Sequence, residues 1–478
     1  MPTTYTPCPV YRKCGGCQLQ NLEYPRQLVW KQDRCQKLLG KFGKVSPILG
    51  METPYHYRNK VQAAFAYDKR RGRIVSGVYQ SSTHKIVPID SCQTEDETAD
   101  RIIVSIRGLL KDFKLQAYDE DTGRGFLRHV LVKRGFSTGQ VMVVLVTGTP
   151  VFTAKKHFVE KLRELHPEIT TILQNVNDKR TSLVLGEREK VLYGPGYIVD
   201  ELCGCRFRIS AKSFYQINPV QTEVLYSKAM EFAGLSGREK VLDAYCGIGT
   251  IGLVAAKHGA GQVLGVELNP DAVKDAIQNA RENGMKNAWF TCGDAGAFLE
   301  EAALERERWD VVFMDPPRAG ASREFLTALC ACAPKRVVYI SCDPETLSRD
   351  LGVLQANHYK IEQIQPVDMF PHTQHIETVV LLSKLNTKQH IEVELNLDEL
   401  DLTAAESKAT YDEIKAYVLE KYGLKVSSLY ISQVKRKCGL DVGQNYNLSK
   451  KEDAKVPQCP PEKEAAIMDA LKHFQMIM

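Results

Sequence analysis

The region from about residue 213 to residue 384 alternates between short apolar strands and helical segments. Seven runs have strand character: 240–245, 262–268, 288–293, 309–315, 336–341, 359–367 and 378–384. Helical segments separate the first five runs, and another helical segment follows the fifth. Parallel strands need a crossover connection, which is usually a helix. This alternation therefore predicts an α/β fold with a mostly parallel, Rossmann-like sheet covered on both faces.

Three other segments have different patterns, and we expect four domains in the 478 residues. The first segment contains clustered cysteines and a helical stretch. The second contains predicted strands separated by glycine-containing turns, including a strand at 181–186. The last contains an acidic stretch followed by helical stretches. At roughly 100–200 residues per domain, this length suits such an organisation. The expected domains are an N-terminal cysteine segment with a helix (1–56), a β-rich central domain (57–212), the α/β domain (213–384) and a small helical C-terminal appendage (385–478).

The composition excludes several classes of protein. Hydrophobic residues make up 44% and charged residues 25%, which is ordinary for a globular chain. No apolar run is long enough to span a membrane, and residues 1–9 lack the pattern of a secretory signal. We therefore expect a cytoplasmic protein without a membrane partner. The net charge of +5 says little about nucleic acid.

A glycine-rich loop follows the first strand of the α/β region. Gly247, Gly249 and Gly252 have G-x-G-x-x-G spacing, which lets the backbone approach a ligand at the start of a helix. Glu267 ends the next strand, where a carboxylate can accept both ribose hydroxyls of an adenosine. Both NAD-linked proteins and S-adenosylmethionine (SAM)-dependent proteins fit this pattern, and so does a bare glycine-rich turn.

The fourth strand favours SAM. Asp315 is expected at its carboxyl end and is followed by two prolines, which stiffen the loop at the edge where such sheets bind ligands. An Asp-Pro-Pro loop at this strand resembles SAM-dependent methyltransferases that act on bases. A plain turn with Asp315 as a cap is the alternative.

Cys342 follows the fifth strand and is expected at the same edge as Asp315. A thiolate there can add to C6 of uracil, which makes the otherwise weakly nucleophilic C5 able to accept a methyl group. A base must then remove the C5 proton, and Glu377, just before the last strand, is the candidate. The alternative is that Cys342 is a small buried hydrophobe.

Four cysteines near the N-terminus have the spacing of a metal site. Cys8, Cys14 and Cys17 are close in sequence, and the distant Cys92 can complete a set of four thiolates. Without an export signal, the cysteines of the chain are expected to be reduced. Zinc and an iron–sulfur cluster both suit four thiolates, and the spacing does not choose between them.

Taken together, the segments DAYCGIGTIG, GVELNPDAV, MDPPRAG, SCDPETL and HIETVVLL resemble the uracil-5 RNA methyltransferase family. The resemblance covers about residues 8–384. It implies a SAM-dependent methyltransferase in which Cys342 is the nucleophile and Glu377 the proton acceptor. It also implies a set of SAM-contacting residues, namely Gln216, Tyr245, Gly247, Glu267, Asp294 and Asp315.

The same resemblance implies the metal and the substrate. Family members that act on ribosomal RNA carry a [4Fe–4S] cluster on this cysteine pattern, with Cys8, Cys14, Cys17 and Cys92 as ligands. We therefore expect a monomeric 23S rRNA (uracil-C5)-methyltransferase that flips one uridine out of a single-stranded loop. The alternatives are a tRNA uracil-5 methyltransferase, a catalytically inactive RNA-binding iron–sulfur protein and a NAD-linked oxidoreductase.

Two regions contain basic residues that are candidates for RNA contacts. The central domain mixes cations with aromatic side chains, as proteins that bind RNA loops do. A solvated strand face explains any single one of these residues equally well. The residues are Tyr55, Tyr57, Arg58, Lys60, Lys69, Arg70, Arg71, Arg73, Arg124, Arg128 and His129. Because only seven residues precede Cys8, we expect the family's RNA-binding barrel to be absent, and Lys435, Arg436 and Lys437 of the appendage are candidates to replace part of it. A solubilising or self-packing module is the alternative for this appendage.

Overall fold

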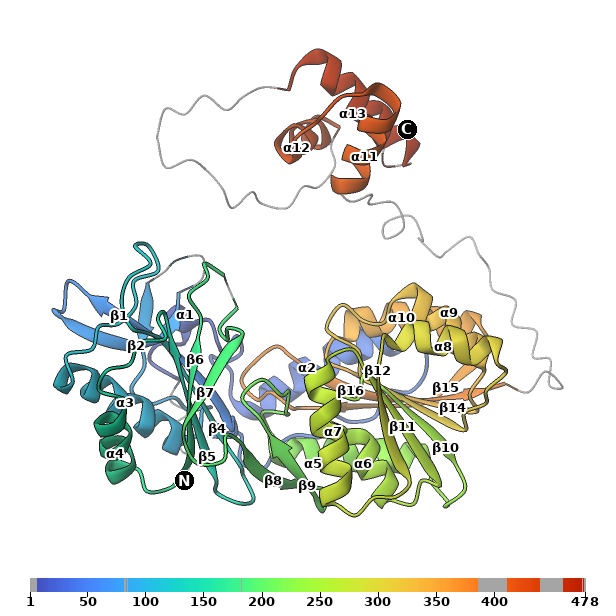
Figure 1. The fold of residues 1–478 in the computed structure, drawn as a ribbon. Helices are drawn as coiled ribbons and strands as arrows, with labels where there is room; N and C mark the ends of the chain where they lie inside the picture. Colours follow the sequence, from blue (N-terminus) through green and yellow to red (C-terminus); the bar gives the residue numbers. More distant parts are fainter. Residues whose placement is uncertain are drawn as a thin grey trace. The chain divides into compact units, whose positions relative to one another are not determined.

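The computed structural model describes residues 7–80, 83, 85–181, 183–385, 411–438, 459–474 and 476. The chain divides into two compact units, Met1–Thr387 and Lys388–Met478 (Figure 1). The acidic stretch at 392–402 lies outside the described residues. None of the helices in the described part of the chain combines the length and the apolar character that a membrane crossing needs.

A seven-stranded sheet forms the second half of the larger unit, in the order β12-β11-β10-β13-β14-β16-β15. The first five strands in sequence are parallel, while β16 runs antiparallel to both β14 and β15. This arrangement confirms the predicted mostly parallel sheet. The strands are β10 (Lys240–Ala244), β11 (Gln262–Glu267), β12 (Ala288–Cys292), β13 (Val311–Met314), β14 (Arg336–Ser341), β15 (Tyr359–Val367) and β16 (Glu377–Lys384).

Helices cover both faces of this sheet, and successive strand residues face opposite sides. Val241 belongs to the apolar cluster shared with α5, α6 and α7, whereas the next residue, Leu242, belongs to the cluster shared with α8, α9 and α10. Because both faces are buried, the central strands β13 and β14 consist largely of buried apolar residues, as central parallel strands usually do. The helices are α5 (Pro219–Ala233), α6 (Thr250–Lys257), α7 (Pro270–Glu282), α8 (Ala295–Leu304), α9 (Arg323–Cys332) and α10 (Pro344–Ala356).

The first half of the larger unit contains a second sheet, in the order β3-β2-β1-β4-β5-β6-β7. Helices α3 (Glu97–Asp112) and α4 (Lys155–Leu165) pack on it through a separate apolar cluster. A short hairpin of β8 (Ile198–Leu202) and β9 (Cys205–Ile209) follows. The strands are β1 (Lys60–Asp68), β2 (Arg73–Tyr79), β3 (Ile86–Pro88), β4 (Leu127–Arg134), β5 (Val141–Thr147), β6 (Ile169–Val176) and β7 (Arg188–Tyr193).

The strand expected at 181–186 is absent from the described part of that segment, which is an irregular loop before β7. The side-chain amide of Asn177 donates hydrogen bonds to the carbonyls of Leu183 (2.7 Å) and Val184 (3.0 Å). These carbonyls are therefore satisfied without a neighbouring strand. Leu183 is 70% exposed, so its apolar side chain does not mark a buried strand.

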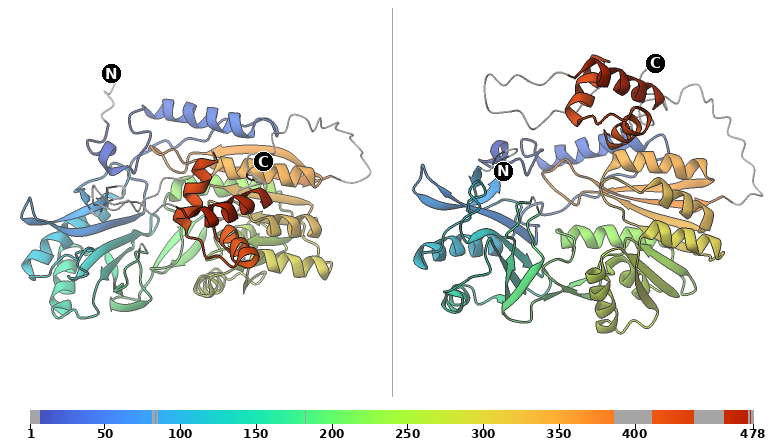
Figure 2. Two further views of the ribbon diagram at one scale, coloured as in Figure 1. Left: turned by 90° about the horizontal axis from the view of Figure 1, so that it is seen from above. Right: turned by 45° about the horizontal axis from the view of Figure 1, so that its top comes forward.

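The N-terminal segment packs against the α/β half, although more than 300 residues separate them in sequence. It contains α1 (Tyr11–Cys14) and α2 (Tyr24–Leu39). Helix α2 lies along α10 and β15, as both views of Figure 2 show (blue beside orange). A fully buried ion pair joins Lys31 of α2 to Asp368 at 2.5 Å, and Tyr24 also donates to Asp368. The segment is thus part of the larger unit.

The smaller unit has its own apolar core. Helices α11 (Tyr411–Tyr422), α12 (Ser428–Lys437) and α13 (Pro461–His473) enclose it. Two of the basic residues expected to contact RNA are engaged within this unit: Lys435 is buried, and Lys437 forms a salt bridge with Glu464 at 2.7 Å.

Candidate functional site

The carboxyl ends of the parallel strands bring several predicted site residues to one edge of the sheet. Strand β10 is paired in parallel with both β11 and β13. Tyr245, Glu267 and Asp315 lie at or directly after the ends of these three strands. In open α/β sheets this edge is where ligands bind.

Cys342 and Glu377 meet at the same edge because β14 and β16 are antiparallel. Ser341, the last residue of β14, lies opposite Thr378 of β16. Cys342 follows Ser341 and Glu377 precedes Thr378, so the pairing register carries the thiol and the carboxyl to neighbouring positions. Cys342 is half-buried, whereas Glu377 is only 4% exposed.

Cys342, Glu377 and Asp315 influence one another electrostatically. Burial raises the pKa of the Cys342 thiol to about 12, with further increases from Glu377 and then Asp315. Burial and the charge of Asp315 also raise the pKa of Glu377 well above its ordinary value, and burial raises that of Asp315 to about 7. The free protein therefore holds a protonated thiol beside two carboxyl groups that resist simultaneous ionisation.

Arg318 is a charged group at this edge that the sequence did not single out. It lowers the pKa of both Cys342 and Glu377, against the effect of burial. Its guanidinium also contacts the ring of His375, whose pKa burial and Arg318 lower to about 4. Its position three residues after Asp315, on the stiff Pro-Pro loop, is the signal that would have identified it.

A cavity of about 350 Å³ opens onto Cys342. Arg34 of α2 lines one side of it and forms a salt bridge with Glu345, which also lines the cavity. No sequence signal pointed to Arg34, because it lies 308 residues before Cys342. The docking of α2 brings it to the same cavity. The full lining is Arg34, Arg318, Cys342, Asp343, Pro344, Glu345, Gln374, His375 and Ile376.

The glycine-rich loop forms a cradle next to Glu267. The backbone N–H of Gly247 donates to Glu267 at 3.0 Å. Gly247 has a φ of +56°, and a Cβ placed there would meet nothing within 4 Å, so the space beside the loop is open. Gly249, the N-cap residue directly before α6, also has a positive φ. The glycines are thus used for backbone conformation and for ligand access.

Tyr245, Asp294 and Gln216, which were also predicted to contact SAM, each make contacts within the protein. The Tyr245 ring packs against Phe325, with ring centroids 5.1 Å apart. Burial and the charge of Asp294 raise the pKa of the Tyr245 hydroxyl. One oxygen of Asp294 caps α8 by accepting from Gly296 and Ala297, so this residue also has a structural role. Gln216 is buried ahead of α5, and its only described hydrogen bond uses its backbone carbonyl.

The acidic character of this edge fits a positively charged cofactor. Asp243 is fully buried, one of its oxygens has no hydrogen-bond partner within the described structure, and burial raises its pKa to about 8. Asp315 and Glu267 raise that pKa further. A sulfonium cation would relieve the repulsion among these three carboxyl groups, and the open cradle at Gly247 offers it space. The residues therefore fit SAM.

The four N-terminal cysteines lie near one another without forming a metal site as they are placed. No three His, Cys, Asp or Glu side chains within the described ranges are grouped closely enough to hold a metal ion. The Cys17 thiol interacts electrostatically with Cys14 and Cys8, and both Cys17 and Cys92 hydrogen-bond to Thr94. Four thiols around one region are the correct donor type for an iron–sulfur cluster.

Several residues that were candidates for RNA contacts are structural instead. Arg128 is 2% exposed and forms a salt bridge with Glu120 at 2.8 Å, and His129 is also buried. Tyr57 is buried and donates to the carbonyl of Pro371 at 2.9 Å. The prediction that these three side chains reach RNA is wrong because each is held inside the fold.

The fold and the acidic edge define a SAM-dependent methyltransferase. Comparisons with known proteins agree. The chain is 44% identical over 385 residues to an uncharacterized RNA methyltransferase of Halalkalibacterium halodurans, covering 80% of this chain and 83% of that protein. An uncharacterized RNA methyltransferase of Clostridium acetobutylicum is 42% identical over 386 residues (79% and 83%).

A solved structure resembles the larger unit. The Pyrococcus abyssi tRNA (uracil-54, C5)-methyltransferase, in complex with S-adenosyl-L-homocysteine, has a TM-score of 0.64 and 29% identity, covering 77% of this chain and 85% of that one. Residues 23–385 match the family described as tRNA (uracil-5-)-methyltransferase. The chain belongs to this family of RNA uracil-5 methyltransferases.

Proposed function

We propose that this protein forms 5-methyluridine in 23S rRNA through a covalent intermediate on Cys342, as a monomer in the cytoplasm. The observation that supports the mechanism best is the register of β14 and β16, which sets Cys342 beside Glu377. Asp315 is close enough to both to raise their pKa values. A nucleophile, a proton acceptor and an anionic cofactor contact are thereby concentrated at one sheet edge.

The Cys342 thiol first releases its proton to solvent. The thiolate sulfur then attacks C6 of a flipped-out uridine, and the new C–S bond moves the electrons of the 5,6 double bond toward C5 and O4. Arg318 assists because its positive charge favours the thiolate. When bound, SAM would supply an electrophilic methyl group to C5, with cleavage of its S–CH3 bond and S-adenosylhomocysteine as the leaving group. Gly247, Glu267 and Asp315 would hold this cofactor.

Glu377 completes the reaction by removing the proton from C5. The electrons of the C5–H bond re-form the 5,6 double bond, and the C–S bond breaks, so Cys342 is released. Glu377 accepts this proton in its carboxylate form, which the positive charge of Arg318 favours against burial and Asp315. Once ionised in a poorly solvated site, a carboxylate is a stronger base than one in water.

A ribosomal substrate is supported by the cysteine pattern of residues 8–92, which resembles that of the family members that act on ribosomal RNA. The tRNA alternative is supported by the solved relative from Pyrococcus abyssi, which is described as a tRNA methyltransferase. Mass-spectrometric mapping of 5-methyluridine in rRNA and tRNA, from cells with and without this gene, tests the proposal. Loss of the mark from tRNA alone would contradict it.

A [4Fe–4S] cluster bound by Cys8, Cys14, Cys17 and Cys92 is part of the proposal. The cluster would hold the N-terminal segment against the central sheet, and no step of the reaction uses it. Iron and sulfide analysis of anaerobically purified protein should give about four of each per chain. A single zinc ion and no sulfide would contradict the cluster while leaving the methylation proposal intact.

A further inference from the structure

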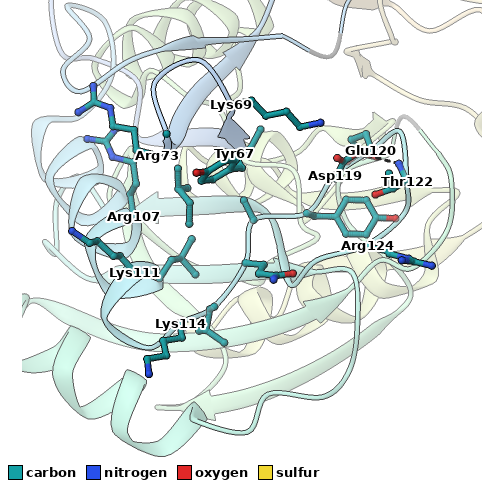
Figure 3. Close-up of a pocket in the computed structure, with 18 of the residues that line it drawn as sticks. Tyr67, Lys69, Arg73, Arg107, Lys111, Lys114, Asp119, Glu120, Thr122 and Arg124 are labelled. Atoms are coloured by element: carbon teal, nitrogen blue, oxygen red, sulfur yellow. Dashed lines mark hydrogen bonds between the residues drawn. The ribbon is translucent and has the colours of Figure 1, made fainter.

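A large groove in the first half of the larger unit has no role in the proposed reaction. Its volume is about 1110 Å³, and it shares no lining residue with the cavity at Cys342. The β1–β2 hairpin forms one wall, α3 and the residues after it form another, and the loop before β4 forms a third (Figure 3). We call it the α3 groove.

The α3 groove has an excess of positive charge, from six cationic and three acidic lining side chains. Arg107 forms a salt bridge with Asp90, whereas none of the other five cations forms one with any residue that the structure describes. These five come from three separate elements and surround the groove (Figure 3). They are Lys69, Arg73, Lys111, Lys114 and Arg124.

The acidic residues of the groove are engaged in local contacts. Asp119 accepts hydrogen bonds from the backbone of Asp121 and Thr122, which closes the loop on itself. Glu120 is bound to Arg128 through both of its oxygens. Asp119 and Glu120 are thus held by contacts other than salt bridges to the five cations, although Lys69 is near enough to Asp119 to interact with its charge. The five exposed cations can therefore be reached by an external anion.

An exposed aromatic side chain accompanies these cations. Tyr67, on β1, is 57% exposed at the groove wall and lies opposite Ile74 of β2, one register position from Arg73. Proteins that bind single-stranded nucleic acids combine an exposed aromatic ring with several cations, because the cations bind phosphates and the ring stacks on an unpaired base.

We propose that the α3 groove binds a single-stranded segment of the substrate RNA, separate from the segment that carries the target uridine. The inference rests on the proposed function for the identity of the RNA. Phosphates contact Lys69, Lys111, Lys114 and Arg124, and one base stacks on Tyr67. A duplex does not satisfy this arrangement, because its bases are already stacked within the helix.

The groove cations are tested with the full chain and a matched control. K111E/K114E reverses two charges in the groove, and K155E/K156E reverses two equally exposed charges at the start of α4, outside it. With an rRNA fragment that extends beyond the target loop, K111E/K114E should raise Kd about tenfold or more and lower the salt dependence by about two counterions. The control should change neither, and kcat should be the same for both variants.

Tyr67 is tested by Y67A and Y67F. Loss of the ring in Y67A should raise Kd for the same fragment about tenfold, whereas Y67F should bind like the wild type because it can still stack. A short oligonucleotide limited to the target loop should bind all variants equally well.

Three results would overturn the groove proposal. The first is an unchanged Kd of K111E/K114E for the extended fragment. The second is a loss of affinity in K111E/K114E that is equally large for the short oligonucleotide. The third is a loss of affinity in K111E/K114E that is equally large for a duplex of the same length, while Y67A binds like the wild type. A further contrary result concerns an acidic peptide. If such a peptide binds the wild type more tightly than RNA does, and loses this binding in K111E/K114E, the groove would be assigned to an acidic peptide instead of RNA. Failure of the wild type to methylate any RNA would instead contradict the proposed function.

Discussion

Glu377 is the residue whose replacement should separate the two halves of the proposed reaction. In Glu377→Gln the thiol can still add to C6, and the loss of a neighbouring negative charge favours the thiolate. The C5 proton then has no acceptor, so turnover should fall by about 10²–10⁴-fold while a covalent protein–RNA species accumulates. Denaturing gel electrophoresis with labelled RNA measures it.

The double variant Cys342→Ala with Glu377→Gln is the control and should form no adduct. A covalent species that persists in it would show that another residue is the nucleophile. Full turnover by Glu377→Gln would assign proton removal to a different group.

The buried acids at the sheet edge make a prediction about pH and stability. Asp243 and Asp315 have pKa values raised to about 8 and about 7 in the folded protein, whereas both titrate near 4 when unfolded. Between these values the folded state holds protons that the unfolded state has released. The free energy of unfolding should therefore be largest below about pH 4 for these groups, and should fall as pH rises toward 8.

Thermal melts of the ligand-free protein at about pH 6 and about pH 9 measure this effect, to which the buried carboxyl groups of Glu377 and Glu95, whose pKa values are also raised, contribute in the same direction. Asp243→Asn can keep the hydrogen bond from Gly252 without a charge, so its melting temperature should decline less between the two pH values. An equal decline in both proteins would assign the pH dependence to other groups.

At the scale of elements, one fully buried ion pair contributes to the docking of α2, together with the apolar contacts of Cys35 and Leu39. Lys31 and Asp368 are both fully buried, and Lys31 also donates to the carbonyl of Phe370 at 3.0 Å. Lys31→Met would leave the Asp368 carboxylate buried without its cation, so we expect a loss of about 3–5 kcal/mol in the free energy of unfolding. Urea denaturation measures it.

The exposed pair of Lys161 and Glu164 on α4 provides the contrast. Lys161→Ala should leave the free energy of unfolding nearly unchanged, because exposed pairs contribute little. Similar effects for Lys31→Met and Lys161→Ala would mean that water reaches Asp368 and that α2 is not fixed by this pair.

The same elements explain what the sequence predicted and what it did not. The runs at 240–245 and 262–268 match β10 and β11 to within one residue, because apolar strands between capped helices give a strong local signal. The prediction of a strand at 181–186 was wrong. The Asn177 side chain hydrogen-bonds to a backbone carbonyl of that loop, and hydrophobic periodicity in the sequence does not reveal such a contact. Cys342 and Glu377 were found by their places at strand ends, whereas Arg34 belongs to the cavity only through tertiary docking.

At the scale of the whole molecule, the two units have separate apolar cores, and this separation carries the last prediction. The core of residues 411–476 consists of its own three helices, and none of its members comes from the larger unit. Two of the three basic residues considered for RNA binding there are engaged internally, Lys435 by burial and Lys437 by Glu464. A chain ending at residue 387 should therefore melt at the same temperature as the larger unit of the full protein, and should methylate RNA with the same kcat and Kd. Calorimetry and RNA binding of the two chains measure this, and a tenfold loss of RNA affinity on truncation would show that the smaller unit contributes to RNA binding after all.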